Sequence, residues 1–179
     1  MIQRFFTSDL HLGHENILQS RPEFQNIDEM DECLIQNWNK KVNVQDEVYI
    51  LGDFSFRAKK SVHQYLGRLR GKKHLIIGNH DGQWMKDMGD LSIYFESVSD
   101  IKTIRYEKKA IVLCHYPMFE WPGKSYMLHG HVHGNKNTVT YQTIKDYLPL
   151  LLNCCVDVNH FEPVTMEELL ENNEVWYER

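Results

Sequence analysis

Stretches of apolar residues that end in polar, glycine-containing sequence recur along the first half of the chain. Three short β-type runs, at residues 2–7, 47–51 and 74–77, each stop at a loop rich in Asp, Asn, His and Gly. Between them, apolar residues recur at helical spacing in two segments, at Met30, Leu34, Ile35 and Trp38 and at Val62, Tyr65, Leu66 and Leu69. This alternation of strand and helix predicts βαβ units with right-handed crossovers and a sheet that is buried on both faces.

The second half of the chain has a different pattern, because the helical period fades after about residue 92. Short β-type runs follow at residues 93–96, 99–106, 110–114 and 151–158, and we expect them to form a mostly antiparallel set. Thr165 and Glu168 have the spacing of a capping box, which predicts a final short helix through Leu169 and Leu170. Together the halves predict one domain over residues 1–179, an α/β sandwich of two facing sheets with helices outside.

Composition places the chain among ordinary globular proteins. Of its 179 residues, 42% are hydrophobic and 25% are charged, which supplies one core and argues against extended disorder. The net charge of −5 gives no overall attraction to a polyanion, so any phosphate or nucleic acid binding has to be local. The first residues lack the apolar region of a signal peptide, and no stretch reaches the roughly 18 apolar residues of a membrane span. We therefore expect a cytoplasmic protein with no membrane partner.

Cysteine and histidine differ in what they indicate. The four cysteines, Cys33, Cys114, Cys154 and Cys155, form no C-x-x-C pair, so neither a disulfide framework nor a thiolate zinc site is indicated. We expect them to be reduced and partly buried. The ten histidines are many for this length, and several lie beside glycine or aspartate in expected loops, where imidazole is more often functional than packed.

Five expected loop segments concentrate potential metal ligands. They are Asp9-x-His11, Gly52-Asp53, Gly78-Asn79-His80-Asp81, His115 and Gly130-His131-Val132-His133-Gly134. Imidazole, carboxylate and amide oxygen without thiolate suit manganese, iron, zinc and related divalent ions. Ligands two residues apart in an extended segment project from one face and can hold one ion or two adjacent ions. A lone histidine or aspartate is usually a solvated or hydrogen-bonded group, but an ordered set of this size is not explained in that way.

The ordered set D-x-H, G-D, G-N-H-D, H and G-H-x-H resembles the calcineurin-like metallophosphoesterase superfamily. The resemblance covers residues 9 to 133, and the opening Asp-Leu-His-Leu-Gly-His-x-Asn-Ile is similar to that of small, cap-free microbial and phage members. It implies a four-layer αββα sandwich of two mixed sheets flanked by helices, and two divalent metal ions, for which manganese, iron, zinc and nickel are candidates. One departure is that Gly-Asp-Phe-Ser-Phe lacks the second acidic residue found in many members, which bears on subgroup and substrate more than on the metal site.

The resemblance also implies a role for each residue of the set. One ion would be bound by Asp9, His11, Asp53 and His133, and the other by Asp53, Asn79, His115 and His131. Asp53 would bridge the ions, and a hydroxide held between them would attack phosphorus in line. His80 would face the substrate beside Asn79 and protonate the leaving oxygen, with Asp81 tuning it. With two dications, two carboxylates and one hydroxide, the site keeps a charge of about +1, into which a phosphate can settle.

Three features admit two interpretations each. The acid-free basic run comprises Arg57, Lys59, Lys60, Arg68, Arg70, Lys72 and Lys73, and it fits a solvated helix face better than a nucleic acid patch. Arg57 is interpreted separately, because it is near Asp53 in sequence, and we expect it to bind the substrate phosphate. The aromatic segment 116–126 either stacks a nucleobase or aryl leaving group or packs across the rim. His14 and Asn16 either begin a helix or orient a ligand, and we expect the helix start.

These observations predict a two-metal phosphoester hydrolase, a phosphodiesterase or broad phosphoesterase whose partner is a small phosphoester or phosphodiester substrate. The residues beyond the sandwich are too few for a large cap, so we expect an open site. One alternative is a nuclease or nucleotide phosphatase of the same fold, and the acidic net charge counts against nucleic acid as the partner. Another is a non-catalytic interaction module, which would be expected to have lost ligands. The oligomeric state stays open.

Overall fold

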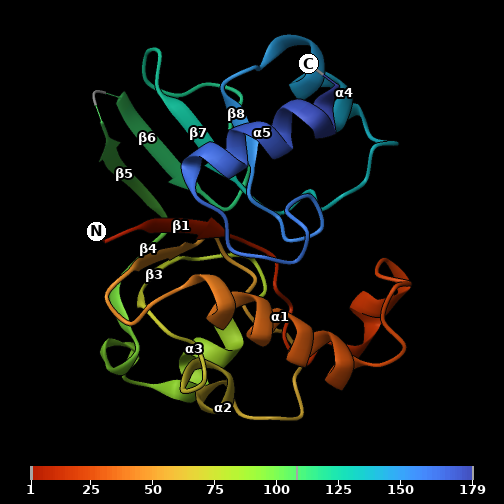
Figure 1. Ribbon diagram of the computed structural model, residues 1–179, viewed down its shortest axis with the longest axis vertical. Coiled ribbons are helices and arrows are strands. Elements are labelled where there is room, and N and C mark those ends of the chain that lie inside the picture. The colour runs from red at the N-terminus through yellow and green to blue at the C-terminus, as the bar shows by residue number, and fades with distance from the viewer. Residues whose placement is uncertain (1, 108, 179) are drawn as a thin grey trace.

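The first half of the chain forms a four-stranded parallel sheet. The structure is a computed structural model that describes residues 2–107 and 109–178. Every pairing in this sheet is parallel, and its strands in spatial order are β1 (Arg4–Thr7), β2 (Glu47–Ile50), β3 (Lys72–Ile76) and β4 (Phe95–Ser99). The helices on its outer face, at the bottom of Figure 1, are α1 (Ile27–Lys41), α2 (Val62–Leu66) and α3 (Gly82–Met88). The βαβ arrangement expected from the alternating pattern is therefore confirmed.

The second sheet is mixed, and in this respect the sequence pattern was misleading. Its strands in spatial order are β5 (Ile101–Tyr106), β6 (Lys109–Cys114), β7 (Tyr126–His129) and β8 (Leu151–Asn153). The β5–β6 pair is antiparallel, whereas β6–β7 and β7–β8 are parallel. The expectation of a mostly antiparallel second half is therefore wrong. Parallel neighbours require crossovers, and the helix α4 (Val139–Tyr147), which was not expected, lies in the crossover from β7 to β8.

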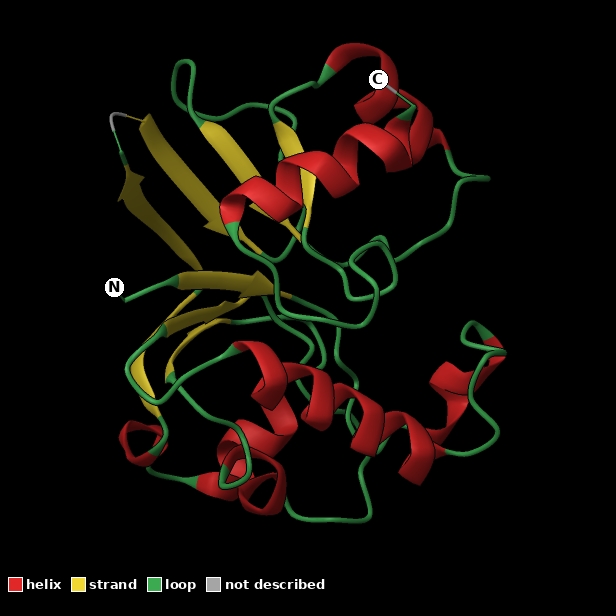
Figure 2. Ribbon diagram, in the orientation of Figure 1, coloured by secondary structure: helices red, strands yellow, loops and turns green. Residues whose placement is uncertain are grey.

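Alternation of side chains along the strands explains the four layers. In β2, Val48 and Ile50 pack with α1 and its neighbours, whereas Tyr49 faces the second sheet. In β7, Leu128 joins the core between the sheets and Met127 packs toward α4 and the C-terminal helix. Because successive residues of a strand project to opposite faces, both sheets are covered on both sides. The result is the expected α/β sandwich, and Figure 2 shows its strands between a lower and an upper group of helices.

Two helices begin at side-chain caps, and the second of these is the capping box expected from the sequence. Asn26 accepts a hydrogen bond from the Glu29 backbone N–H at 2.9 Å, and α1 starts at the next residue. The helix α5 (Met166–Tyr177) begins with the expected capping box, in which Thr165 Oγ1 accepts from the Glu168 backbone N–H at 3.3 Å. The Glu168 carboxylate accepts in return from the Thr165 backbone N–H at 2.8 Å. The expected final helix is confirmed, and it continues to Tyr177.

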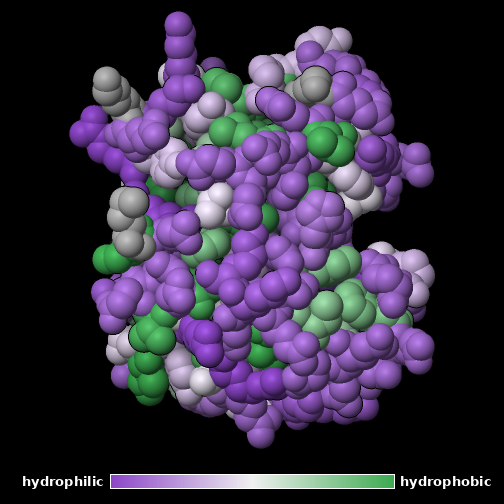
Figure 3. Space-filling view, in the orientation of Figure 1, coloured by the Kyte–Doolittle hydropathy of each residue, from purple (hydrophilic) through white to green (hydrophobic). Residues whose placement is uncertain are grey.

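The surface is largely hydrophilic on the face shown in Figure 3. A hollow lies at the right-hand edge of that view, between the upper and lower halves of the molecule. Strand β1 runs toward the same side in Figure 1, so the polar loop that follows it lies on the side of the hollow. Within the described parts of the chain, no helix combines the length and the apolar character needed to cross a membrane.

Candidate metal centre

All seven expected ligands follow the carboxyl ends of strands. Asp9 and His11 follow β1, Asp53 follows β2, Asn79 follows β3, His115 follows β6, and His131 and His133 follow β7. Loops at the carboxyl ends of neighbouring parallel strands meet at one edge of a sheet. The two sheets are joined at this edge, because the backbone N–H of His131 donates to Asp9 Oδ1 at 3.0 Å. Within the second sheet, the backbone N–H of Gly130 donates to the His115 carbonyl at 2.9 Å, which joins the loops after β6 and β7.

Five of these seven residues have a left-handed backbone, a feature that the sequence gave no means of expecting. Their φ angles are 56° at Asp9, 51° at His11, 53° at Asp53, 70° at His131 and 51° at His133. Residues with a side chain rarely adopt this conformation, which costs about 1–3 kcal/mol each unless the surroundings impose it. Hydrogen bonds of 3.0 Å from Asp9 N to Gly52 O and from His11 N to Asp53 O hold the loops in place. Strain gathered at clustered polar residues is typical of functional sites.

The deeper group of donors consists of Asp9, His11 and His133. One donor atom from each lies within 4.8 Å of the others. His11 is 2% exposed, and neither of its ring nitrogens has a hydrogen-bond partner among the described residues. Burial, helped by the nearby His133, lowers the pKa of His11 to about 2, so the ring is neutral at pH 7. Buried, neutral imidazole nitrogens without partners fit a divalent cation, which would satisfy them.

The second group lies closer to solvent and centres on Asn79. Its Oδ1 is 3.0 Å from His115 Nε2 and 2.9 Å from His131 Nδ1. The other nitrogen of His115, Nδ1, donates to the Leu51 carbonyl at 2.7 Å, so a neutral ring presents a lone pair at Nε2. Two lone pairs directed at one place repel each other, and a shared cation would relieve that repulsion. Asn79 and His131 are exposed, which leaves this group open to a ligand.

Asp53 lies between the two groups. Its Oδ2 is 3.7 Å from His11 Nε2 in the deeper group and 3.6 Å from His115 Nε2 in the outer group. The carboxylate is almost fully buried, and its Oδ1 accepts from the backbone N–H of His80 at 2.9 Å. A carboxylate in this position could be shared by two ions, one in each group.

Glycine permits these close approaches. A Cβ at Gly130 would lie 2.5 Å from Asp9 Oδ2, and a Cβ at Gly52 would lie 2.5 Å from His115 Nδ1. Both distances are far shorter than real Cβ contacts, so any side chain at these positions would displace a donor. The glycines of the motif therefore make room for the donors themselves.

Asp157 and Arg21 complete the surroundings of the deeper group, and the sequence interpretation missed both. His133 Nδ1 donates to Asp157 Oδ2 at 2.9 Å, which leaves Nε2 as the free nitrogen, 3.9 Å from Asp9 Oδ1. Arg21 is fully buried and donates to Asp157 Oδ1 at 2.7 Å and to the Asp9 carbonyl at 2.6 Å. A carboxylate that orients a metal-binding histidine in this way is common around metal sites. The signal was present, because Asp157 follows β8 as the other donors follow their strands, but residues 151–158 were interpreted as one strand.

The charges around Asp157 distinguish it from a third ion site. Although burial alone would raise its pKa, the hydrogen bond from His133 and the Arg21 guanidinium hold the pKa of this carboxyl well below its usual range. In the same contact, burial alone would lower the pKa of His133, but Asp157 and Asp9 outweigh it and raise that pKa. The Cys155 thiol also donates to Asp157, at 2.8 Å. Although His133, Cys155 and Asp157 have metal-like spacing, the adjacent guanidinium disfavours a cation there.

Asp81 has a different setting from the one expected. It is fully buried and accepts from the backbone N–H groups of Asp53 at 2.9 Å, Phe54 at 2.9 Å and Gly78 at 2.8 Å. The indole N–H of Trp84 donates to it at 2.8 Å. These contacts favour a positioning role, in which Asp81 joins the loops after β2 and β3, over the direct tuning of His80 that was expected.

His80 and Arg57 lie at the edge of the donor cluster. The His80 side chain is 34% exposed, and its Nε2 lies 4.0 Å from Asp53 Oδ2, so it can reach both the cluster and solvent. Its ring centre is 4.0 Å from that of Phe56. Arg57 is exposed, and its guanidinium carbon lies 4.9 Å from the centre of the Phe56 ring. The structure thus brings Arg57 to the His80 side of the cluster through Phe56.

The structure also gives the positions of the segment after His14, the aromatic segment 116–126 and the adjacent cysteines. Residues 15–19 form a short 3-10 helix, so the expected helix start at His14 is confirmed. In the aromatic segment, Tyr116 packs with its ring centre 4.7 Å from that of His131, whereas Phe119 is 83% exposed. Cys154 and Cys155 are free and fully buried, and burial raises the pKa of both thiols, which disfavours reactive thiolates.

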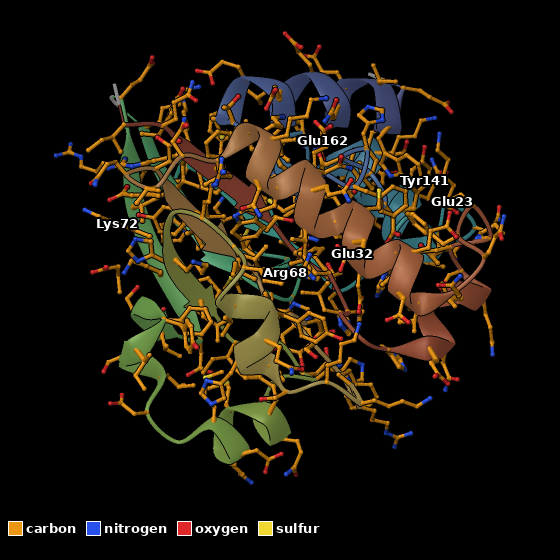
Figure 4. The ribbon with its side chains drawn as sticks, turned by 60° about the horizontal axis from the view of Figure 1, so that its bottom comes forward. Glu23, Glu32, Arg68, Lys72, Tyr141 and Glu162 are labelled. Carbon is orange, nitrogen blue, oxygen red and sulfur yellow. The ribbon has the colours of Figure 1, made fainter. Side chains whose placement is uncertain are left out.

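Three of the seven cations of the basic run are paired with carboxylates. Lys59 pairs with Glu15 at 2.6 Å and Lys60 pairs with Asp28 at 2.6 Å. Arg68 pairs with Glu32 of α1, also at 2.6 Å, and Figure 4 shows these two side chains close together. These pairs are exposed and contribute little stability. They do, however, reduce the positive charge that a nucleic acid surface would need, which agrees with a solvated face.

The fold and this arrangement of donors are those of a metallophosphoesterase. The chain belongs to the calcineurin-like phosphoesterase family, whose model matches residues 4–176.

Known relatives extend from phages to archaea and bacteria. The chain is 32% identical to the Gene 66 protein of Mycobacterium phage L5 over an alignment of 163 positions, which covers 74% of this chain and 78% of that protein. It is 30% identical to an uncharacterized protein of Methanocaldococcus jannaschii over an alignment of 186 positions, which covers 96% of this chain and 93% of that protein. The crystal structure of a protein of unknown function from Aquifex aeolicus is 29% identical, with a TM-score of 0.75, and the match covers 96% of this chain and 99% of that one. These relatives support the family and the fold, and their names assign no substrate.

Proposed function

We propose that this protein is a phosphoester hydrolase that depends on two divalent ions and acts on small phosphodiesters. The observation that carries the proposal is the position of Asp53, whose Oδ2 lies 3.7 Å from His11 Nε2 and 3.6 Å from His115 Nε2. A single carboxylate between two sets of imidazoles and oxygens suits a pair of adjacent dications.

Each of the two groups of residues would hold one ion. Asp9, His11, Asp53 and His133 would hold one ion, and Asp53, Asn79, His115 and His131 would hold the other. Bound there, two divalent ions would act as Lewis acids on the phosphoryl group and make a water molecule nucleophilic at neutral pH. Manganese, iron, zinc and nickel all suit this donor set. The exposed side of Asn79 and His131 would admit the phosphate.

His80 is the residue placed to handle the leaving group. It is partly exposed and is held beside Asp53 by the hydrogen bond of its backbone N–H to Asp53 Oδ1, at 2.9 Å. A histidine at this edge would donate a proton to the leaving oxygen as the ester bond breaks. Arg57, on the same side, would hold a phosphoryl oxygen of the substrate with its guanidinium. Asp81 would keep the loops of Asp53 and Gly78 in register.

The proposal is tested by turnover of bis-p-nitrophenyl phosphate in the presence of Mn²⁺. We expect activity that disappears with a chelator and returns when Mn²⁺ is restored. In Asp53→Asn, which keeps the shape and removes the bridging charge, kcat/KM should fall by about 100-fold or more. Asp146→Asn, an exposed change on α4, is the matched control and should retain activity. Full activity of Asp53→Asn would refute the bridging role.

A nuclease of the same fold remains the alternative to exclude. The ion pairs of Lys59, Lys60 and Arg68 disfavour it, since a polymer substrate needs a row of available cations. Oligonucleotide affinity that falls steeply with salt concentration would support the nuclease instead. A non-catalytic module predicts no turnover and no binding of Mn²⁺ by calorimetry.

A further inference from the structure

A cavity of about 580 Å³ opens beside His80 and outside the donor cluster. It lies between the segment of residues 55–63 on one side and α3 on the other. Phe56, Val62, Trp84 and Met88 give it an apolar floor. Its volume falls within the range of about 300–1,000 Å³ typical of small-molecule sites.

The cavity and the donor cluster share His80 as a wall. On one side, His80 Nε2 lies 4.0 Å from Asp53 Oδ2. On the other, its ring packs at 4.0 Å, between ring centres, against Phe56 at the start of the apolar floor. A group attached to an oxygen beside His80 therefore has the cavity directly behind it.

The charges at the rim argue against a second phosphate as the occupant. Lys59 and Lys60 line the cavity, but their ammonium groups lie 2.6 Å from the carboxylates of Glu15 and Asp28. The Arg57 guanidinium lies over the Phe56 ring, 4.9 Å from its centre. With both lysines paired to carboxylates, the apolar floor favours an uncharged planar group, whose apolar faces are transferred out of water on binding.

We propose that this cavity binds a planar aromatic group carried on the leaving oxygen of the substrate. This inference rests on the proposed function and adds the class of ester to it. Nucleobases and simple aryl rings share this chemistry, since both are flat, uncharged rings whose faces stack on aromatic side chains, and both are of a size that the cavity holds. The protein would accordingly prefer aromatic esters to small alkyl esters of the same charge.

Non-hydrolysable phosphonates separate the contribution of the cavity from that of the metal centre. Methylphosphonate and phenylphosphonate carry the same charged group and differ in the methyl or phenyl group on phosphorus. We expect phenylphosphonate to inhibit Mn²⁺-dependent turnover of bis-p-nitrophenyl phosphate with a Ki about 10-fold lower than that of methylphosphonate, because the ring is buried. Calorimetry on the Mn²⁺-loaded protein should give the same ratio of Kd values.

A variant that fills the cavity provides the second measurement. Gln83 lies on α3 at the cavity wall, is exposed, and donates to Asp87 at 2.9 Å. In Gln83→Trp the indole should occupy the cavity and abolish the advantage of phenylphosphonate, while methylphosphonate binds as before. The matched control is Gln142→Trp, because Gln142 is an exposed residue of α4 that makes the same contact with Asp146, at 2.7 Å. The control should keep the 10-fold ratio, and thermal melting should show both variants folded.

The outcomes distinguish the inference from the function on which it rests. If methylphosphonate binds but phenylphosphonate has no advantage, or if Gln83→Trp leaves the ratio unchanged, the aromatic site is refuted and the proposed hydrolase stands. If neither phosphonate binds the Mn²⁺-loaded protein, the proposed function fails and the inference fails with it. The affinity for a 5′-methylenephosphonate of adenosine, measured in the same way, shows whether the ring is a nucleobase or a simple aryl group. Tighter binding than phenylphosphonate indicates a nucleoside ester, and equal or weaker binding indicates a simple aryl ester.

Discussion

Asp157 holds His133 in place across 24 residues of sequence, with 2.9 Å between Asp157 Oδ2 and His133 Nδ1. Arg21 is fully buried and holds the same carboxylate at 2.7 Å from the other side. A buried guanidinium, a carboxylate and an imidazole thus form a chain that ends at the free Nε2 of His133. This chain fixes which nitrogen is available to an ion.

Asp157→Asn should therefore weaken metal binding. The amide keeps the shape but removes the charge that orients His133 and balances Arg21, so we expect the affinity for Mn²⁺ to fall about 10- to 100-fold. Isothermal calorimetry measures this without recourse to catalysis. The control is Asp46→Asn, because Asp46 is also buried and accepts hydrogen bonds near β2, away from the donors. Unchanged Mn²⁺ affinity in a folded Asp157→Asn protein would contradict the positioning role.

His80→Ala should separate substrates by their leaving groups. Loss of a proton donor matters most when the leaving oxygen is strongly basic, so we expect about a 100-fold loss for an alkyl or nucleoside ester. For p-nitrophenyl esters the loss should be only a few fold, since p-nitrophenolate leaves without a proton. The comparison is made on kcat for both substrate types. His160→Asn serves as the control, because His160 is exposed and Asn tolerates its φ of 56°. Equal losses on both substrates would rule out the acid role.

Removal of divalent ions should lower thermal stability. A bound ion would add stability at His11, where the backbone is strained and the buried ring nitrogens have no partner in the described part of the chain. At Mn²⁺ about 100-fold above its Kd, linkage contributes about 2.7 kcal/mol, or roughly 5–10 °C in Tm for a chain of this length. Differential scanning calorimetry with and without a chelator tests this. The increase in Tm on adding Mn²⁺ should be much smaller in Asp53→Asn. A Tm of the wild type that does not change with Mn²⁺ would exclude a metal centre in these residues.

Lys73 should make stability rise with pH in the alkaline range. Its side chain on β3 is 6% exposed, its Nζ donates to the Gly71 carbonyl at 3.0 Å, and burial lowers its pKa from 10.5 to about 8. Between these two values the unfolded chain binds more protons than the folded one, so the free energy of unfolding increases as pH rises. Below about pH 8 the cost of the buried charge is fully present.

Lys73→Met removes that cost and provides the measurement. At pH 7 the variant should be more stable than the wild type by on the order of 1–3 kcal/mol, and the difference should shrink as pH approaches 10.5. Urea unfolding at pH 7, 8.5 and 10 gives the free energies. Lys72→Met, the exposed neighbour on the same strand, should show no such trend. A difference that is independent of pH would mean that Lys73 is charged and solvated in both states.

The elements of the first half were predictable because local signals agreed with the fold. Apolar runs stop at polar loops, and the spacing of Met30, Leu34 and Trp38 marks one helix face. In the second half, β7 has four residues and follows the aromatic segment, so it shows no alternation long enough to detect. The parallel order of β6, β7 and β8 depends on a crossover through α4, and no local pattern specifies it.

The amino-acid sequence was sufficient to name the class of fold and a set of candidate donors, because these residues follow strands and each motif occupies a few consecutive positions. It could not supply the contact of Arg21 with Asp157, which joins residues 136 apart, or the cavity that shares His80 with the donors. Nor could it show that Asp9, His11 and Asp53 lie in left-handed conformations. Such features depend on two sheets packed face to face, since long-range packing and hydrogen bonds impose geometries that no short segment prefers alone.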